Sequence, residues 1–209
     1  MRSIVRQLIV ANIIVFALQK LFGSSAIAHF ALWPIGKFYW AEVNTEVGFQ
    51  PWQLLTSAFL HDPQNYAHIA LNMFALYMFG GDVERALGSR RFAWLYGASI
   101  LTAGIVQLVV VTATVQSGVV PTLGASGGVF GVLLAFAMLY PQRRVMLIFP
   151  PIPMPAWLLV TGYGLVELAS GVFGMQQGVA HFAHLGGMLG ALIVLLAAPR
   201  ARQPIQRDD

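Results

Sequence analysis

Long apolar runs separated by short polar turns fill most of the chain. They cover residues 4–22, 66–86, 92–115, 126–140, 156–173 and 178–198. A bilayer core of ~30 Å takes about 20 apolar residues per helical crossing, so each run is a candidate span. The fourth run is short and follows a charge-free turn, so we expect its helix to start within the bilayer. The pattern predicts an all-α membrane protein, a bundle of six transmembrane helices.

The connection between the first two runs differs from the others in its length and its aromatic content. Residues 23–65 include Trp33, Phe38, Tyr39, Trp40 and Trp52. Aromatic side chains favour the membrane–water interface, and an amphipathic segment there lies partly in the bilayer. We therefore expect a long amphipathic first outer loop. No other connection approaches this length, so we expect one membrane domain over residues 1–209 and no soluble domain.

Composition supports the membrane class and narrows the chemistry. The chain is 57% hydrophobic and 10% charged, whereas soluble domains carry about 25% charged residues. It has no cysteine, which excludes a disulfide, a thiolate metal site and a cysteine nucleophile. We expect the chain to lie in the lipid bilayer and not to bind nucleic acid.

The positions of the cations predict the orientation. Ten of the twelve Lys and Arg lie in the N-terminus, two turns and the C-terminal tail: Arg2, Arg6, Arg85, Arg90, Arg91, Arg143, Arg144, Arg200, Arg202 and Arg207. Six spans bring these four segments to one side, which the positive-inside rule makes the cytoplasm. We expect a multi-pass protein of a bacterial cytoplasmic membrane with both termini cytoplasmic.

The stretch from Gly124 to Gly131 carries one hydroxyl, Ser126, among glycines at a predicted helix start. Missing side chains let another backbone approach closely, and the free amides at a helix start can hold an oxyanion. Small residues between membrane helices also serve packing alone. The stretch therefore indicates a nucleophile only if a base lies near it.

Three polar side chains share one predicted depth. Ser126, His68 and His184 stand 17, 17 and 16 residues from Arg143, Arg85 and Arg200. At 1.5 Å per residue, each lies ~25 Å above the arginines. Asn72 lies one turn below His68 on the same helix face. The common depth brings these groups together from three helices.

These residue types suit serine hydrolysis. Ser126 is the candidate nucleophile and His184 the base that takes its proton. His68 and Asn72 are candidate donors to an oxyanion. Phe130, four residues after Ser126, is expected to pack against the imidazole of His184. We find no Asp or Glu spaced to orient His184, so we expect a Ser-His dyad.

Glycine pairs spaced i, i+4 explain how the serine and histidine helices could touch. Gly127 and Gly131 lie on one run, and Gly186 and Gly190 lie on the other. Such small-xxx-small faces permit close backbone approach. Because alanine is also a small residue, we expect alanine substitutions at these glycines to be milder than leucine substitutions.

Structural alternatives remain for several polar residues. Each histidine could simply join helices by a hydrogen bond. His181 and His184 form a His-x-x-His pair without a third ligand in view, so we expect no metal. His181, one turn nearer the surface, is expected at the interface. Glu167, the only acid deep inside a run, is either protonated and bonded to Tyr163 or lines a wet cavity.

At these residues the chain resembles the rhomboid intramembrane serine proteases, from the second to the sixth run. The resemblance rests on His68-x-x-x-Asn72, Glu84-Arg85-Ala-Leu-Gly88, Gly124-Ala-Ser126-Gly127 and Ala183-His184-Leu-Gly-Gly187. It implies Ser126 as nucleophile, His184 as base, His68 and Asn72 as oxyanion residues, support from Gly124, Gly127, Phe130 and Gly187, and no cofactor. Two positions depart from the family: its first-loop Trp-Arg pair reads Trp52-Gln53, and its frequent Tyr after the serine is Phe130.

The sequence and the resemblance together favour an intramembrane serine endopeptidase that cleaves transmembrane protein substrates near their outer ends. One alternative is a non-proteolytic protein that binds membrane helices with the same fold. The other is a small transporter, against which the lack of an internal repeat counts.

Overall fold

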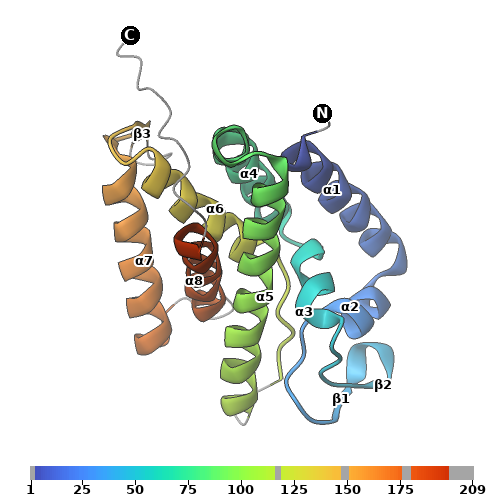
Figure 1. The fold of residues 1–209 in the computed structure, drawn as a ribbon. Helices are drawn as coiled ribbons and strands as arrows, with labels where there is room; N and C mark the ends of the chain where they lie inside the picture. The colour runs from blue at the N-terminus through green and yellow to red at the C-terminus, as the bar shows by residue number, and fades with distance from the viewer. Residues whose placement is uncertain (1–2, 116–118, 147–150, 176–179, 198–209) are drawn as a thin grey trace.

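The computed structural model describes residues 3–115, 119–146, 151–175 and 180–197 of the chain (Figure 1). Of its helices, eight are α-helices: α1 (Ile4–Phe22), α2 (Ser24–Phe30), α3 (Gln53–Thr56), α4 (Tyr66–Leu87), α5 (Ser89–Ala113), α6 (Ser126–Leu139), α7 (Ala156–Phe173) and α8 (His181–Ala197). Two 3-10 turns accompany them, η1 (Ala41–Val43) and η2 (Ser57–Phe59). Residues 178, 179 and 198 of the last predicted run, and the cations Arg2, Arg200, Arg202 and Arg207, lie outside the described residues.

Two short hairpins add to the predicted all-α fold. Strand β1 (Phe38–Trp40) pairs antiparallel with β2 (Thr45–Val47), and β3 (Arg144–Met146) pairs antiparallel with β4 (Pro153–Pro155). Asn44 takes a left-handed backbone conformation directly before β2, with φ 51°. Asparagine tolerates that conformation better than most residues, which fits a tight turn at this position.

Among the described residues, three helices, α1, α5 and α7, are long and apolar enough to cross a membrane. The helices α6 and α8 are apolar and shorter. The class predicted from the sequence, a mostly helical membrane protein, is confirmed.

Helix α8 occupies the middle of the bundle. It packs against α5, α6 and α7, and Figure 1 shows it between α5 and α7 with α6 passing obliquely. Leu76, Phe92, Leu95, Val132 and Ala135 are fully enclosed in the main apolar core. This core joins α4, α5 and α6, and it packs against the buried face of the helix that starts at Ser126.

Helix α1 stands at the edge of the molecule and is held at its two ends. Near its start, Glu84 of α4 accepts hydrogen bonds from the backbone amides of Ile4 and Val5 at 2.8 and 3.2 Å and from the hydroxyl of Ser3 at 2.6 Å. An anion at a helix N-terminus satisfies amides that have no partner within the helix. Near its end, the side chain of Gln19 bonds the backbone of His61.

The long first connection is a folded unit and not an extended loop. Its elements α2, β1, β2 and α3 lie together beside the C-terminal end of α1 (Figure 1). They enclose an apolar cluster of their own: Ile27, Ala28, Ala31, Trp33, Val47 and Leu60. Trp33 is fully buried, and its indole N–H reaches the carbonyls of Ile27 and Ala28.

Gln53 holds this unit together at the position where the resemblance predicts arginine. Its side-chain oxygen accepts from the amides of Trp33 and Gln50, at 3.3 and 3.0 Å. Its side-chain nitrogen lies within hydrogen-bond reach of the carbonyls of His29 and Gly48. Gln53 is 1% exposed. A neutral amide therefore supplies both donors and acceptors to a buried site, where a cation would need a counter-charge.

Candidate active site

Ser126 is the first residue of α6 and stands two residues after Gly124, whose backbone conformation favours glycine. Gly124 has a φ of +136°, which residues with side chains rarely adopt. A Cβ there would also lie 2.8 Å from Nε2 of His68. The amide of Gly124 donates to the carbonyl of Ser57 at 2.9 Å, and this bond links the turn to the first connection. The turn thus requires glycine for its conformation and for its space.

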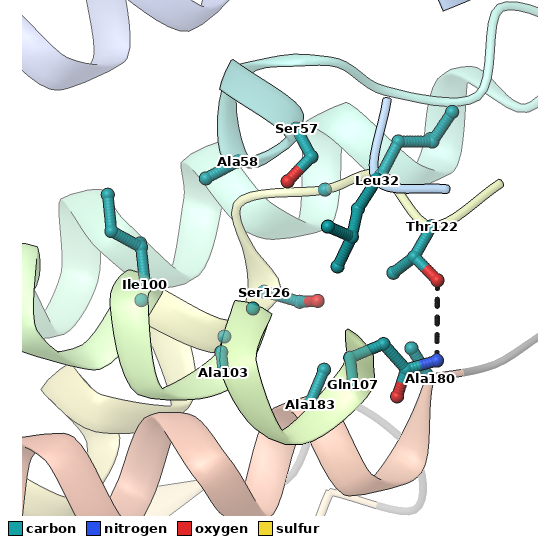
Figure 2. Close-up of a pocket in the computed structure, with 15 residues that line it drawn as sticks. Leu32, Ser57, Ala58, Ile100, Ala103, Gln107, Thr122, Ser126, Ala180 and Ala183 are labelled. Atoms are coloured by element: carbon teal, nitrogen blue, oxygen red, sulfur yellow. Dashed lines mark hydrogen bonds between the residues drawn. The ribbon is translucent and has the colours of Figure 1, made fainter. Parts of the chain in front are cut away.

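The hydroxyl of Ser126 faces a pocket between α5, α8 and the first connection, as Figure 2 shows. Leu32, Ser57, Gln107 and Ala183 are among the residues that line it. Two backbone hydrogen bonds of 2.9 Å between Leu32 and Thr122 close one side of it. The side-chain nitrogen of Gln107 donates to the hydroxyl of Thr122 at 3.3 Å, which fixes another part of the wall.

His184 meets Ser126 across the interface between α6 and α8. Its Nε2 lies 2.8 Å from the Oγ of Ser126. Its ring stacks on Phe130, with centroids 4.2 Å apart and planes 4° apart. The contact predicted between Phe130 and the imidazole is therefore present. This pair has the separation that a nucleophile and its base require.

His68 and Asn72 lie on one face of α4, and His68 is directed to the serine turn. Nδ1 of His68 accepts from the amide of Asp62 at 3.4 Å, so the proton of the neutral ring is on Nε2. That N–H lies against Gly124, two residues before Ser126. Asn72 is buried, and its side-chain nitrogen donates to the carbonyl of His68 at 3.0 Å. His68 is thus placed to donate beside the serine, whereas one donor of Asn72 is used within its own helix.

A further histidine, His61, lies behind His68 at the edge of the site. It is fully buried, and its ring centroid is 5.1 Å from that of His68. Burial, with a smaller contribution from His68, lowers the pKa of His61 to about 4. The ring is therefore neutral at physiological pH. Sequence reasoning did not identify His61, because no spacing rule connects it to His68.

Glycines bring α8 against α6, although not with the pairing that the sequence predicts. A Cβ at Gly187 would overlap the carbonyl of Gly127, and one at Gly131 would lie 2.9 Å from the carbonyl of Gly187. Gly186 and Gly190 instead face α5, where added Cβ atoms would meet Thr102 and the backbone around it. The expectation that Gly186 and Gly190 face the serine helix is wrong. Gly187, one turn after His184, shares the histidine's face.

Glu167 of α7 contradicts the expectation that no acid is placed to orient His184. Its Oε2 lies 2.9 Å from Nδ1 of His184 and 2.7 Å from Nδ1 of His181. His181 is 6% exposed, so it is buried within the protein. The sequence does not show the rotation of α7 about its axis, which decides where Glu167 points.

The described part of the chain contains no group of three or more His, Cys, Asp or Glu placed to hold a metal ion. His181 and His184 both direct a ring nitrogen at the same carboxylate oxygen of Glu167. At these distances the two rings contact the carboxylate directly, as in hydrogen bonds. A shared metal would instead need His181, His184 and Glu167 to surround one empty point.

Comparisons with known proteins show which family the chain belongs to. The Rhomboid domain family matches residues 48–200. Rhomboid protein 1, mitochondrial, of Saccharomyces cerevisiae is 34% identical over 140 residues, which are 66% of this chain and 40% of the yeast protein. RHOMBOID-like protein 12, mitochondrial, of Arabidopsis thaliana is 29% identical over 217 residues, which cover 97% of this chain and 59% of the plant protein. Presenilin-associated rhomboid-like protein, mitochondrial, of Homo sapiens is 33% identical over 140 residues, which are 65% of this chain and 35% of the human protein.

The chain belongs to the rhomboid family, whose members are generally intramembrane serine proteases. It spans between 35% and 59% of the length of these three relatives. Their names place them in mitochondria. The comparisons therefore support an integral membrane protein and give no support to the predicted bacterial membrane.

Proposed function

We propose that this chain is an intramembrane serine endopeptidase with Ser126 as nucleophile and His184 as general base. The observation that carries the proposal is the 2.8 Å separation between Oγ of Ser126 and Nε2 of His184, at the wall of a pocket. Membership of the rhomboid family supports the same chemistry.

In the proposed reaction, Oγ of Ser126 bonds to the carbonyl carbon of the scissile peptide, and its proton moves to Nε2 of His184. The carbonyl electron pair becomes an oxyanion, which the N–H of His68, the amide of Asn72 and the backbone amide of Ser126 stabilise. The carbon–nitrogen bond then breaks, and His184 returns the proton to the leaving amine. Water repeats the sequence on the ester and releases Ser126.

The proposed substrate is a transmembrane protein cut near its outer end. A helix hides its carbonyls in hydrogen bonds, so a substrate must unwind locally before Ser126 can reach one. Residues that weaken helices, such as glycine and proline, favour this unwinding. We expect a reporter segment with glycine near its outer end to be cleaved faster than one with leucine there.

The direct test is cleavage of a reporter membrane segment by purified protein in detergent. Ser126→Ala and His184→Ala are expected to abolish cleavage, and a fluorophosphonate is expected to label the wild-type protein but not Ser126→Ala. Loss of one oxyanion donor typically slows turnover by ~10²–10³, so His68→Ala and Asn72→Ala are expected to be slow and not inactive. Cleavage that persists in folded Ser126→Ala would remove Ser126 as the nucleophile.

The proposal includes six spans, with the serine turn facing outward from the cytoplasm of a bacterial cell. Cysteines at Val120 and Gln142 test this orientation, because the chain has no cysteine of its own and both positions are exposed. An impermeant thiol reagent added outside intact cells is expected to label the variant Val120→Cys and spare Gln142→Cys. The reverse pattern would place the serine turn on the cytoplasmic side.

A further inference from the structure

Glu167 is an acid in an apolar helix, and two imidazoles share one of its oxygens. Nδ1 of His181 and Nδ1 of His184 lie 2.7 and 2.9 Å from Oε2. The contact with His181 is well aligned, whereas the N–H direction of His184 is off the axis of a good hydrogen bond. Catalytic hydrogen bonds are often poorly aligned before substrate binds and tighten in the complex.

The hydrogen-bond partners assign the protons in this cluster. Nε2 of His181 lies 3.0 Å from the carbonyl of Met175, which only accepts, so this nitrogen carries a proton. Nε2 of His184 must be free to accept the proton of Ser126, so the proton of the neutral ring is on Nδ1 and faces Glu167. One further proton lies between His181 and Glu167, on either partner. In both arrangements Oε2 presents a lone pair to His184.

Two contacts fix different motions of the catalytic ring. The parallel stack on Phe130 resists tilting of the imidazole of His184 but leaves rotation within its own plane. A bond at Nδ1 stops that rotation and keeps Nε2 aimed at Ser126. It also stabilises the imidazolium that forms when the ring takes the serine proton.

We propose that Glu167 is the positioning residue of His184, so that the site is a Ser126–His184–Glu167 triad, and that His181 holds the carboxylate in place. This inference rests on the proposed protease function. His181 is itself fixed by the carbonyl of Met175, so the chain of contacts runs from that backbone through Glu167 to the base. Neither Glu167 nor His181 touches the substrate in this arrangement.

A purely structural role for Glu167 predicts different measurements. The acid also attaches α7 to α8, and few residues of α7 are buried: Ala156, Leu159, Val160, Glu167 and Ser170. Loss of an attachment would change stability or the access of a large substrate. It would not slow the reaction of Ser126 with a small reagent that needs no movement of α7.

The experiment compares wild type, Glu167→Gln, Glu167→Asp and Ser170→Ala in the full chain. Ser170 is the matched control because it is buried on α7 one turn from Glu167. The measurements are kcat and KM with a transmembrane reporter, the rate of Ser126 labelling by a small fluorophosphonate, and Tm. For Glu167→Gln we expect kcat and the labelling rate to fall together by at least ~10², with KM unchanged. Glu167→Asp should be slower than wild type by up to about tenfold and faster than Glu167→Gln, and Ser170→Ala should match wild type.

Wild-type kcat and labelling in Glu167→Gln, with a change only in KM or Tm, would overturn the triad and leave the protease proposal intact. A folded wild-type protein that neither cleaves nor labels would overturn both proposals. If Glu167→Gln does not fold, Glu167→Asp carries the test. Its shorter side chain should slow kcat and labelling in parallel at normal KM, and wild-type rates would overturn the triad.

Discussion

Helices α1 and α8 are both apolar, yet they are attached to the rest of the molecule by different chemistry. Of the seventeen residues of α8, seven are buried, and most of these are small: His181, Ala183, His184, Gly186, Gly187, Gly190 and Ala191. Of the nineteen residues of α1, three are buried, and two of them, Asn12 and Gln19, are polar. Helix α8 is held by close backbone approach over residues 186–190, whereas α1 is held by hydrogen bonds at its ends and by apolar packing of its first two turns.

The difference matches what each helix does in the proposed enzyme. Backbone contact leaves little freedom, which suits a helix that must hold His184 within hydrogen-bond reach of Ser126. End bonds fix the position of α1 but leave its outer face to lipid. Four sets of changes, in decreasing order of expected effect, test this contrast.

The largest effect is expected from Gly187→Ala. A Cβ at this position would overlap the carbonyl of Gly127, so α6 and α8 must separate. A misplacement of about 1 Å can reduce catalysis by about 10². We expect at least that loss of kcat in the reporter assay, together with a lower Tm. Gly97→Ala is the control, because nothing lies within 4 Å of its added Cβ.

The same reasoning revises the expectation that alanine is mild at the glycine faces. At Gly131 and Gly190 an added Cβ would meet Ser99 and Thr102 closely. We therefore expect Gly131→Ala and Gly190→Ala to lower Tm, and the leucine variants to lower both Tm and activity further. Wild-type activity and Tm in all four variants would show that backbone approach does not hold α8.

A smaller effect is expected from Glu84→Gln at the start of α1. Glu84 accepts from Ser3, Ile4, Val5 and Ser89, and glutamine keeps the shape but loses the charge and part of the acceptor capacity. A hydrogen bond to a charged group contributes about 1.5–3 kcal/mol. We expect unfolding in detergent to show a loss of this size, with kcat retained. A loss of kcat as large as that of Gly187→Ala would mean that α1 also sets the catalytic geometry.

The smallest effect concerns the buried ring of His61. The backbone of this residue exchanges two hydrogen bonds with the side chain of Gln19 in α1. Its pKa is lowered from 6.5 to about 4, so the folded state binds fewer protons than the unfolded state. Stability from this group is full above pH 6.5 and is lost as the pH falls towards 4. The expected loss between pH 7.5 and 5.5 is about 1 kcal/mol. His61→Phe should remove this part of the pH dependence, whereas a change at exposed His29 should not.

The sequence predicted the meeting of Ser126 and His184 because both depend on one coordinate, the depth along a helix. Depth follows from counting residues at 1.5 Å each. The same count places Glu167 twelve residues from Pro155, about 18 Å from the start of α7 and roughly one turn below the depth of the serine. The missing quantity was the rotation of α7, which depends on packing against α8 and not on the local pattern.

The structure of the first connection could not be predicted from the sequence, for a different reason. Its structure depends on hydrogen bonds between distant segments, such as those of Gln53 with Trp33 and those of Gln19 with His61. Aromatic content indicated an interfacial segment but not its own apolar cluster. The partners of Gly186 and Gly190 were missed because small-residue spacing identifies a contact face without naming the helix that fills it.

The paired backbone bonds between Leu32 and Thr122 also set an order in time. The two residues are 90 positions apart, which at roughly 5–20 residues per second separates their synthesis by about 5–18 s. Trp33 and its neighbours therefore leave the ribosome well before Thr122, which completes this side of the pocket. His184 follows Ser126 by 58 positions, so the proposed nucleophile is made before the proposed base. In the proposed enzyme, a nascent chain therefore lacks its general base until α8 has been synthesised.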